Sequence, residues 1–198
     1  TACTIAEQKF AIPAMGTMAH SWIQLFDSEY EAFLAYAKTY PDSCTLLIDT
    51  YNVLKSGVPN AIKVFDEVLK PRGFRPKGVR IDSGDITYLT KKCRKILDEA
   101  GWEEARIVVS NSLDEYIIRD IINQGAEADV FGVGERLITS KSEPVFGGVY
   151  KLVATENNGK IVPKIKLSEN PEKITTPGYK KIYRLYSKET GKMVADLI

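Results

Sequence analysis

The stretch Gly78-Val79-Arg80-Ile81-Asp82-Ser83-Gly84-Asp85 decides the fold, because a short apolar run passes directly into polar and ionisable residues. An apolar run without polar alternation is typical of a strand that is covered on both faces. Asp85 can accept hydrogen bonds from the free amides of a first helical turn, which predicts a helix running through Leu97 to Gly101. The stretch therefore predicts one strand–loop–helix unit of a parallel sheet.

The same unit recurs between residues 10 and 140. Further strands are expected at Phe10–Met15, Cys44–Asp49, Arg106–Ser110 and Asp129–Val133. Helices are expected from a Ser28 cap to Thr39, from Asn60 to just before Pro71, and from a Ser112 capping box to Gly125. Strands that alternate with helices in this way predict an α/β fold, which we interpret as a partial TIM-like α/β barrel.

The pattern changes after residue 140. Val149–Ala154 and Val162–Leu167 flank the turn Asn157-Asn158-Gly159, which predicts an antiparallel hairpin, and Pro163 places its second strand at a sheet edge. Lys181–Tyr186 and Lys192–Ile198 predict a second hairpin. We therefore expect two regions, a barrel portion with the catalytic loops over residues 1–140 and a small antiparallel β-hairpin region over residues 141–198.

Composition excludes several classes of function. The 198 residues carry 27 Lys and Arg against 26 Asp and Glu, a balance that does not favour binding to nucleic acid or to an anionic membrane surface. No apolar run approaches the ~20 residues that a membrane span needs. Cys3, Cys44 and Cys93 are odd in number and lack Cys-x-x-Cys spacing, so we expect neither a disulfide framework nor a zinc knuckle, and a cytoplasmic location. The chain starts at Thr1 without a visible signal peptide, and we expect its numbering to begin inside a longer protein.

Polar residues follow each expected strand, and in a parallel barrel such strand ends form the active site. Gly16–Trp22, with His20, follows the first expected strand, and Asp49–Asn52 follows the second. Asp82–Asp85, Ser110–Ser112 and Gly132–Arg136 follow the next three. Small, polar and ionisable residues at all five positions predict one pocket for a polyhydroxylated, phosphorylated ligand.

The glycine and serine turns each have two interpretations. Gly132 and Gly134 would let backbone amides approach a phosphate at a helix N-terminus, but short Gly-x-Gly sequences are often plain tight turns. Ser110-Asn111-Ser112 fits either a helix cap or the same phosphate. Residue 137 is Leu, so the G-x-G-x-x-G fingerprint is absent, as is a Walker A sequence, which disfavours classical NAD and ATP loops.

The ionisable candidates also have structural alternatives. Asp82 and Asp85 suit ribose hydroxyls or a hydrated magnesium ion, or else a helix cap with a nearby ion pair. His20, the single histidine, could serve as acid, base or nucleophile, or could be structural. Trp22 and Tyr51 are interpreted as packing residues.

Six blocks of this sequence, in order, resemble the nicotinate phosphoribosyltransferase family. The blocks are Gly16-Thr17-Met18-Ala19-His20-Ser21-Trp22, Leu47-Ile48-Asp49-Thr50-Tyr51-Asn52, Gly78–Asp85, Phe131-Gly132-Val133-Gly134, Pro144–Val153 and Lys166–Lys173. The resemblance covers essentially the whole chain and implies a type II phosphoribosyltransferase, which joins nicotinate to the ribose of phosphoribosyl pyrophosphate. The products are nicotinate mononucleotide and pyrophosphate, and the step feeds NAD synthesis by salvage.

The resemblance also implies roles for individual residues. ATP is a co-substrate whose hydrolysis is coupled through a phosphohistidine at His20, and Asp49 orients that imidazole as the second catalytic residue. The implied substrate-binding residues are Thr17, Arg80, Asp82, Ser83 and Gly84, with Ser110, Asn111, Gly132 and Gly134 holding the 5′-phosphate. Magnesium, the implied cofactor, would be held by Asp82 and Asp85 through water.

Family members are longer than this chain, and they work as homodimers in which the partner subunit completes the active site with an aromatic residue. We therefore expect this stretch of chain alone to have no catalytic activity. Two alternatives stay open: an enzyme that uses nicotinamide or quinolinate instead of nicotinate, and a non-catalytic phosphoribosyl-binding or dimerisation fragment. The sequence gives no reason to expect a nucleic-acid or membrane partner.

Overall fold

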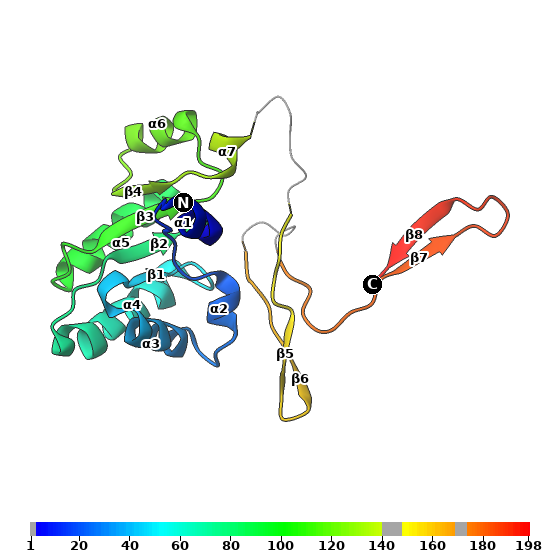
Figure 1. Ribbon diagram of the computed structural model, residues 1–198, viewed down its shortest axis with the longest axis horizontal. Coiled ribbons are helices and arrows are strands. Elements are labelled where there is room, and N and C mark those ends of the chain that lie inside the picture. The colour runs from blue at the N-terminus through cyan, green and yellow to red at the C-terminus, as the bar shows by residue number, and fades with distance from the viewer. Residues whose placement is uncertain (1–2, 140–147, 169–173) are drawn as a thin grey trace.

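A four-stranded parallel sheet organises the first part of the molecule. The computed structural model describes residues 3–139, 148–168 and 174–198. The strands β1 (Thr45–Leu47), β2 (Gly78–Ile81), β3 (Arg106–Ser110) and β4 (Val130–Gly132) lie side by side in chain order, all parallel (Figure 1). This sequential order is that of an α/β barrel wall, and it confirms the expected fold class.

Two of the predicted helix caps are confirmed. Helix α3 (Glu29–Thr39) begins after Ser28, whose side chain accepts a hydrogen bond from the Glu31 amide. Helix α5 (Ile86–Glu99) begins after Asp85, whose Oδ1 accepts from the Tyr88 amide at 2.9 Å. Each cap satisfies a first-turn amide that has no partner inside the helix.

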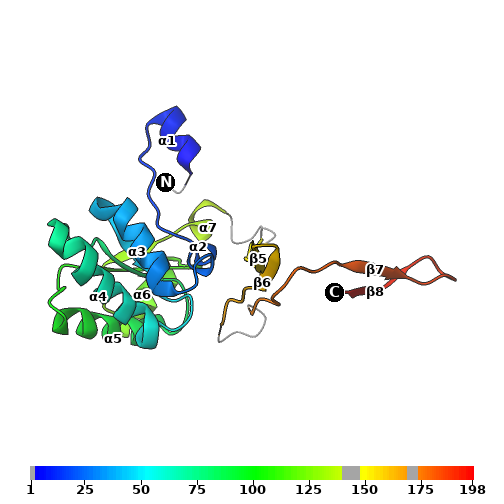
Figure 2. The same ribbon diagram turned by 90° about the horizontal axis from the view of Figure 1, so that it is seen from below.

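The predicted strand Phe10–Met15 is wrong. Phe10 ends helix α1 (Thr4–Phe10), and residues 11–19 run without regular structure to α2 (His20–Gln24). Ala11 closes α1 with a left-handed φ of 52°, and Pro13 has no amide to donate to a sheet. Helix α1 stands away from the sheet in the view of Figure 2.

The helix predicted from Asn60 begins earlier than expected. Asn52 caps it by accepting from the Lys55 amide, and a π-helical turn η2 (Val53–Gly57) leads into α4 (Val58–Val64) and η3 (Phe65–Leu69). A Cβ on Gly57 would lie 2.0 Å from the Ile48 carbonyl oxygen. Only glycine at this position therefore lets the helix lie directly on the end of β1. Asn60 lies inside α4, so a polar residue alone does not mark the start of a helix.

The Ser112 capping box is also wrong. Helix α6 (Glu115–Asn123) is capped by Asp114, which accepts from the Ile117 amide at 2.9 Å. Ser112 has a φ of 54°, whereas a capping residue has an extended backbone. After β4 the chain forms the short helix α7 (Glu135–Ile138).

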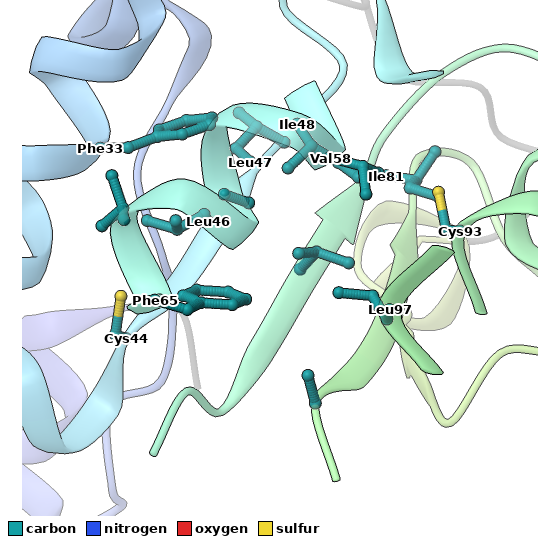
Figure 3. Close-up of a cluster of buried hydrophobic side chains, with 14 of the residues drawn as sticks. Phe33, Cys44, Leu46, Leu47, Ile48, Val58, Phe65, Ile81, Cys93 and Leu97 are labelled. Carbon is teal, nitrogen blue, oxygen red and sulfur yellow. The ribbon is translucent and has the colours of Figure 1, made fainter. Parts of the chain in front are cut away.

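The apolar core lies between the sheet and the helices that cover it. Leu46 and Leu47 of β1 and the next residue, Ile48, pack with residues of α3, α4 and α5, including Phe33, Val58 and Leu97 (Figure 3). Fully buried Phe65 packs edge-on against Trp102, with ring centroids 5.6 Å apart. The buried apolar residues of the described chain all lie between Met18 and Leu113, so this layer holds the strand ends in place.

Two hairpins follow, as predicted, although the strands of the first hairpin lie closer to its turn than expected. Strands β5 (Ala154–Asn157) and β6 (Lys160–Pro163) pair antiparallel around Asn158 and Gly159, whose φ angles of 49° and 74° make a two-residue turn. That turn fixes the register, so the paired strands are Ala154–Asn157 and Lys160–Pro163 rather than the predicted Val149–Ala154 and Val162–Leu167.

The second hairpin, β7 (Tyr183–Tyr186) with β8 (Met193–Leu197), extends away from the rest of the molecule (Figure 1). The expected boundary between the two regions, residues 140 and 141, falls outside the described residues, as do Pro144–Gly147 and residues 169–173 of the family-like blocks. No helix in the described part of the chain is long and apolar enough to cross a membrane. Cys44 and Cys93 are buried thiols outside any disulfide, and Cys3 is exposed.

Candidate active site

His20 lies at the sheet edge where the strands end. It is the first residue of α2, and its Nδ1 lies 3.0 Å from the Thr50 hydroxyl oxygen. Its Nε2 lies 3.8 Å from Asp49 Oδ1 and 3.8 Å from Asp82 Oδ2. The side chain is 18% exposed, so the ring is held in place yet remains accessible. An imidazole between two carboxylates has the geometry of an acid, base or nucleophile of fixed orientation.

Two serine hydroxyls hold the carboxylates. Ser83 donates to Asp49 Oδ2 at 2.5 Å, and Ser110 donates to Asp82 Oδ1. Burial raises the pKa of Asp49, and the His20 ring and the Ser83 hydroxyl oppose that rise. Burial also acts to raise the pKa of Asp82, but His20, Ser110 and Arg80 together lower it below its usual value. The pKa values of the two carboxyl groups that face Nε2 are therefore shifted in opposite directions, upward for Asp49 and downward for Asp82.

A cavity of about 900 Å³ opens beside these carboxylates. This volume is at the upper end of the range for small-molecule sites and suits a ligand of nucleotide size. The polar side chains and backbone that line it come from the ends of β1, β2 and β3 and from a later segment: Asp49, Tyr51, Asn52, Asp82, Ser83, Gly84, Asp85, Ser110, Asn111 and Ser168. The strand ends therefore converge on one pocket.

Most residues that the sequence singled out lie at this cavity. Asp49, Asp82, Ser83, Gly84, Asp85, Ser110 and Asn111 line it. His20 contacts two of its carboxylates, and Arg80 donates from Nη2 to the Met18 carbonyl oxygen at 3.0 Å. Arg80 thus ties the segment before His20 to β2, which positions the imidazole.

Besides His20 and Arg80, three further predicted residues do not line the cavity: Thr17, Gly132 and Gly134. Thr17 donates to the adjacent Met18 carbonyl oxygen in the irregular segment before α2. Gly132 pairs with Ser110 across β3 and β4, and a Cβ on it would lie 3.2 Å from Ser110 Cβ. Gly134 precedes α7, and the Leu137 amide donates to its carbonyl oxygen. Gly132 thus leaves room for Ser110. The roles of Gly132 and Gly134 in binding phosphate stay predictions.

The turn after β3 has an uncommon backbone. Asn111 and Ser112 have φ angles of 85° and 54°, two consecutive non-glycine residues in the left-handed region. Such residues cost about 1–3 kcal/mol each and persist where the surrounding structure holds them. Here the turn brings Asn111 to the cavity wall.

Several site residues lie outside the set predicted from the sequence. The Thr50 hydroxyl contacts His20, and the position of Thr50 directly after Asp49 is a signal that could indicate it. Tyr51 lines the cavity and is 40% exposed, so its interpretation as a packing residue is wrong. Trp22 does pack, against Phe26, with ring centroids 5.0 Å apart. Leu167 and Ser168 reach the cavity from the hairpin region, which no local pattern indicates.

The site offers oxygen ligands to a cation without forming a closed cage. Among the described residues, no three His, Cys, Asp or Glu side chains are grouped so that they could hold a metal ion. Asp82 and Asp85 both line the cavity, where the first accepts from Ser110 and the second caps α5. A magnesium ion that keeps several waters and binds substrate phosphates needs only one or two such carboxylates.

Comparisons with known proteins agree with this geometry. Residues 2–184 match the nicotinate phosphoribosyltransferase (NAPRTase) family. The chain is 49% identical over 193 residues to nicotinate phosphoribosyltransferase of Bacillus subtilis, covering 98% of this chain and 39% of that protein. It is 39% identical over 177 residues to the human enzyme of that name, covering 86% of this chain and 32% of that protein.

Solved structures share the fold. The crystal structure of human nicotinic acid phosphoribosyltransferase superposes with a TM-score of 0.57 at 25% identity, covering 98% of this chain and 45% of that one. That of Porphyromonas gingivalis nicotinate phosphoribosyltransferase gives 0.61 at 23% identity, covering 85% and 46%. The chain thus spans less than half the length of these relatives. Because the family match extends over residues 2–184, the chain belongs to the nicotinate phosphoribosyltransferase family.

Proposed function

We propose that this chain carries the catalytic loops of an enzyme that forms nicotinate mononucleotide and pyrophosphate from nicotinate and phosphoribosyl pyrophosphate, in NAD salvage. The observation that carries the proposal is His20 between Asp49 and Asp82 at the edge of a nucleotide-sized cavity. Family membership supports the reaction, because the relatives matched above carry that name.

In the transfer step, the pyridine nitrogen of nicotinate bonds to the anomeric carbon while the bond from that carbon to the pyrophosphate oxygen breaks. Positive charge develops on the ribose during this displacement. Asp49 and Asp82 supply negative charge beside the cavity. The charge of buried Asp49 stabilises such a cation more than it would in water. The chain's task is therefore to position the reactants and to stabilise charge.

We further propose that ATP transfers its terminal phosphoryl group to an imidazole nitrogen of His20, releasing ADP, and that later hydrolysis of this phosphohistidine drives the cycle. Thr50 at Nδ1 and the two carboxylates at Nε2 fix the ring for that exchange. Asp82 and Asp85 would hold hydrated magnesium, which neutralises the departing pyrophosphate. A homodimer whose partner subunit supplies an aromatic residue to the pyridine site completes the proposal.

Replacing His20 in the full-length enzyme tests the coupling. We expect His20→Ala to abolish nicotinate-stimulated ATP hydrolysis while some uncoupled transfer remains, because the carboxylates and the cavity are intact. Nucleotide product and ADP would be measured in the same reactions, with the melting temperature as the control for folding. Equal loss of both activities would show that His20 acts in the transfer step itself. Assays with nicotinamide and quinolinate as the base would detect the alternative substrates.

A further inference from the structure

The segment that follows the first hairpin returns to the cavity. After β6, the Lys164 amide donates to the Val153 carbonyl oxygen at 2.8 Å, and the Gly178 amide donates to the same oxygen at 2.7 Å. Leu167 and Ser168 then line the cavity together with Asp49 and Asp82. The hairpin is the yellow element between the sheet and the β7–β8 hairpin in Figure 1. Leu167 and Ser168 thus add a wall from the hairpin region to a pocket that is otherwise built from the α/β part.

The cavity needs positive charge that its wall does not provide. Among the described residues that line it are three aspartates, Asp49, Asp82 and Asp85, and neither Lys nor Arg. Phosphoribosyl pyrophosphate carries a phosphate and a pyrophosphate, so these carboxylates would repel it. Of the nearby guanidinium groups, Arg80 is engaged with the Met18 carbonyl oxygen and Arg136 with Asp114.

Lys166 is the ammonium group placed to supply that charge. It precedes the wall residues Leu167 and Ser168, is half-buried, and its Nζ lies 3.5 Å from the Leu167 carbonyl oxygen. That contact is at the limit of hydrogen-bond distance, so the ammonium group can exchange it for a stronger acceptor. Its charge also acts on Asp49: burial raises the pKa of that carboxyl, and Lys166 is among the groups that lower it.

We propose that Lys166 is a substrate-binding residue that contacts a phosphate group held beside His20, and that this group is the pyrophosphate of phosphoribosyl pyrophosphate. This inference rests on the proposed function for the identity of the substrate. A charge-assisted hydrogen bond from an ammonium group to phosphate is stronger than one between neutral groups. The hairpin region would then take part in binding directly.

The test uses the full-length enzyme with Lys166→Ala, Lys166→Arg and the control Lys160→Ala. Lys160 begins strand β6 of the same hairpin and is exposed, so its replacement removes an equal charge away from the cavity. We expect Lys166→Ala to weaken binding of magnesium pyrophosphate, measured by calorimetry, and to raise the KM for phosphoribosyl pyrophosphate, each by about tenfold or more. Lys166→Arg should recover most of the loss, and Lys160→Ala should match the wild type.

The KM values for the other two substrates show which phosphate group Lys166 contacts. The KM values for nicotinate and for ATP should change less than twofold in Lys166→Ala. A rise confined to the KM for ATP would assign Lys166 to the nucleotide phosphate and overturn the proposal, as would unchanged pyrophosphate binding. If the wild type forms no nicotinate mononucleotide, the proposed function fails, while the pyrophosphate affinities of the variants still decide the role of Lys166.

Discussion

At the scale of single residues, Ser83 controls the charge of the carboxylate beside His20. Its hydroxyl donates to Asp49 Oδ2 at 2.5 Å, and this hydrogen bond favours the ionised form. Asp49 is 5% exposed, and burial already raises its pKa above the ordinary value for aspartate. The Ser83 hydroxyl therefore opposes the rise in the pKa of Asp49 that burial causes.

Ser83→Ala should move the acid limb of the pH profile. Without the hydroxyl, the pKa of Asp49 rises further, so a higher pH is needed to ionise it. We expect the acid limb of kcat/KM in the full-length enzyme to shift to higher pH. Ser43→Ala, an exposed serine outside the cavity, should leave the profile in place. A downward shift, or none, would show that Asp49 does not limit the rate at low pH.

At the scale of elements, helix ends depend on backbone conformation as well as on residue type. Asp114, 8% exposed, caps α6 and also accepts from Arg136 of α7, so a single side chain connects two helices. Ser112 precedes it by two residues but has a left-handed φ of 54°. Both residues are good capping types, and only one has the extended backbone that a cap requires.

This difference predicts unequal effects of two alanine substitutions. Asp114→Ala should lower the free energy of unfolding by about 1–3 kcal/mol, since it removes the cap and leaves Arg136 without this carboxylate. Ser112→Ala should change it by less than about 0.5 kcal/mol, because the Ser112 side chain caps no helix and alanine carries the same Cβ in the left-handed backbone. Urea unfolding followed by far-ultraviolet circular dichroism would measure both. Equal effects would indicate that the capping interaction seen at Asp114 adds nothing to stability.

At the scale of the whole molecule, stability comes from the α/β part. Every buried apolar side chain of the described chain lies between Met18 and Leu113, whereas all residues of β7 and β8 are exposed. Arg184 and Asp196 pair across that hairpin on its surface, where ion pairs contribute little. The β7–β8 hairpin therefore adds nothing to the core.

A chain that ends at Lys180 should unfold with the same free energy as the whole chain, to within about 0.5 kcal/mol. Chemical denaturation followed by the fluorescence of buried Trp102 would measure the core directly, because this ring packs against Phe65. The matched control is Phe65→Ala, which should cost about 3–5 kcal/mol. Marked destabilisation by the truncation would show that the hairpin packs against the α/β part after all.

The sequence by itself determined the repeating unit and the edge of the sheet where chemistry occurs. Apolar runs predict β1 to β4, Ser28 and Asp85 predict helix starts, and polar residues at the strand ends predict a shared pocket, because each signal lies within a few neighbouring residues. The sequence failed at Phe10–Met15 and at Ser112, where Pro13 and a left-handed backbone override residue type.

Only the tertiary structure decided which distant groups meet. Leu167 and Ser168 close the cavity beside Asp49, although nothing in their local patterns indicates it. Thr50 follows a strand as a site residue should, but only the fold brings its hydroxyl to His20. Such contacts depend on how a later segment packs against the sheet, and that packing is set by the sum of many weak contacts and by hydrogen bonds to backbone groups such as the Val153 carbonyl. Short-range periodicity cannot encode them, since it records only which face of an element is apolar.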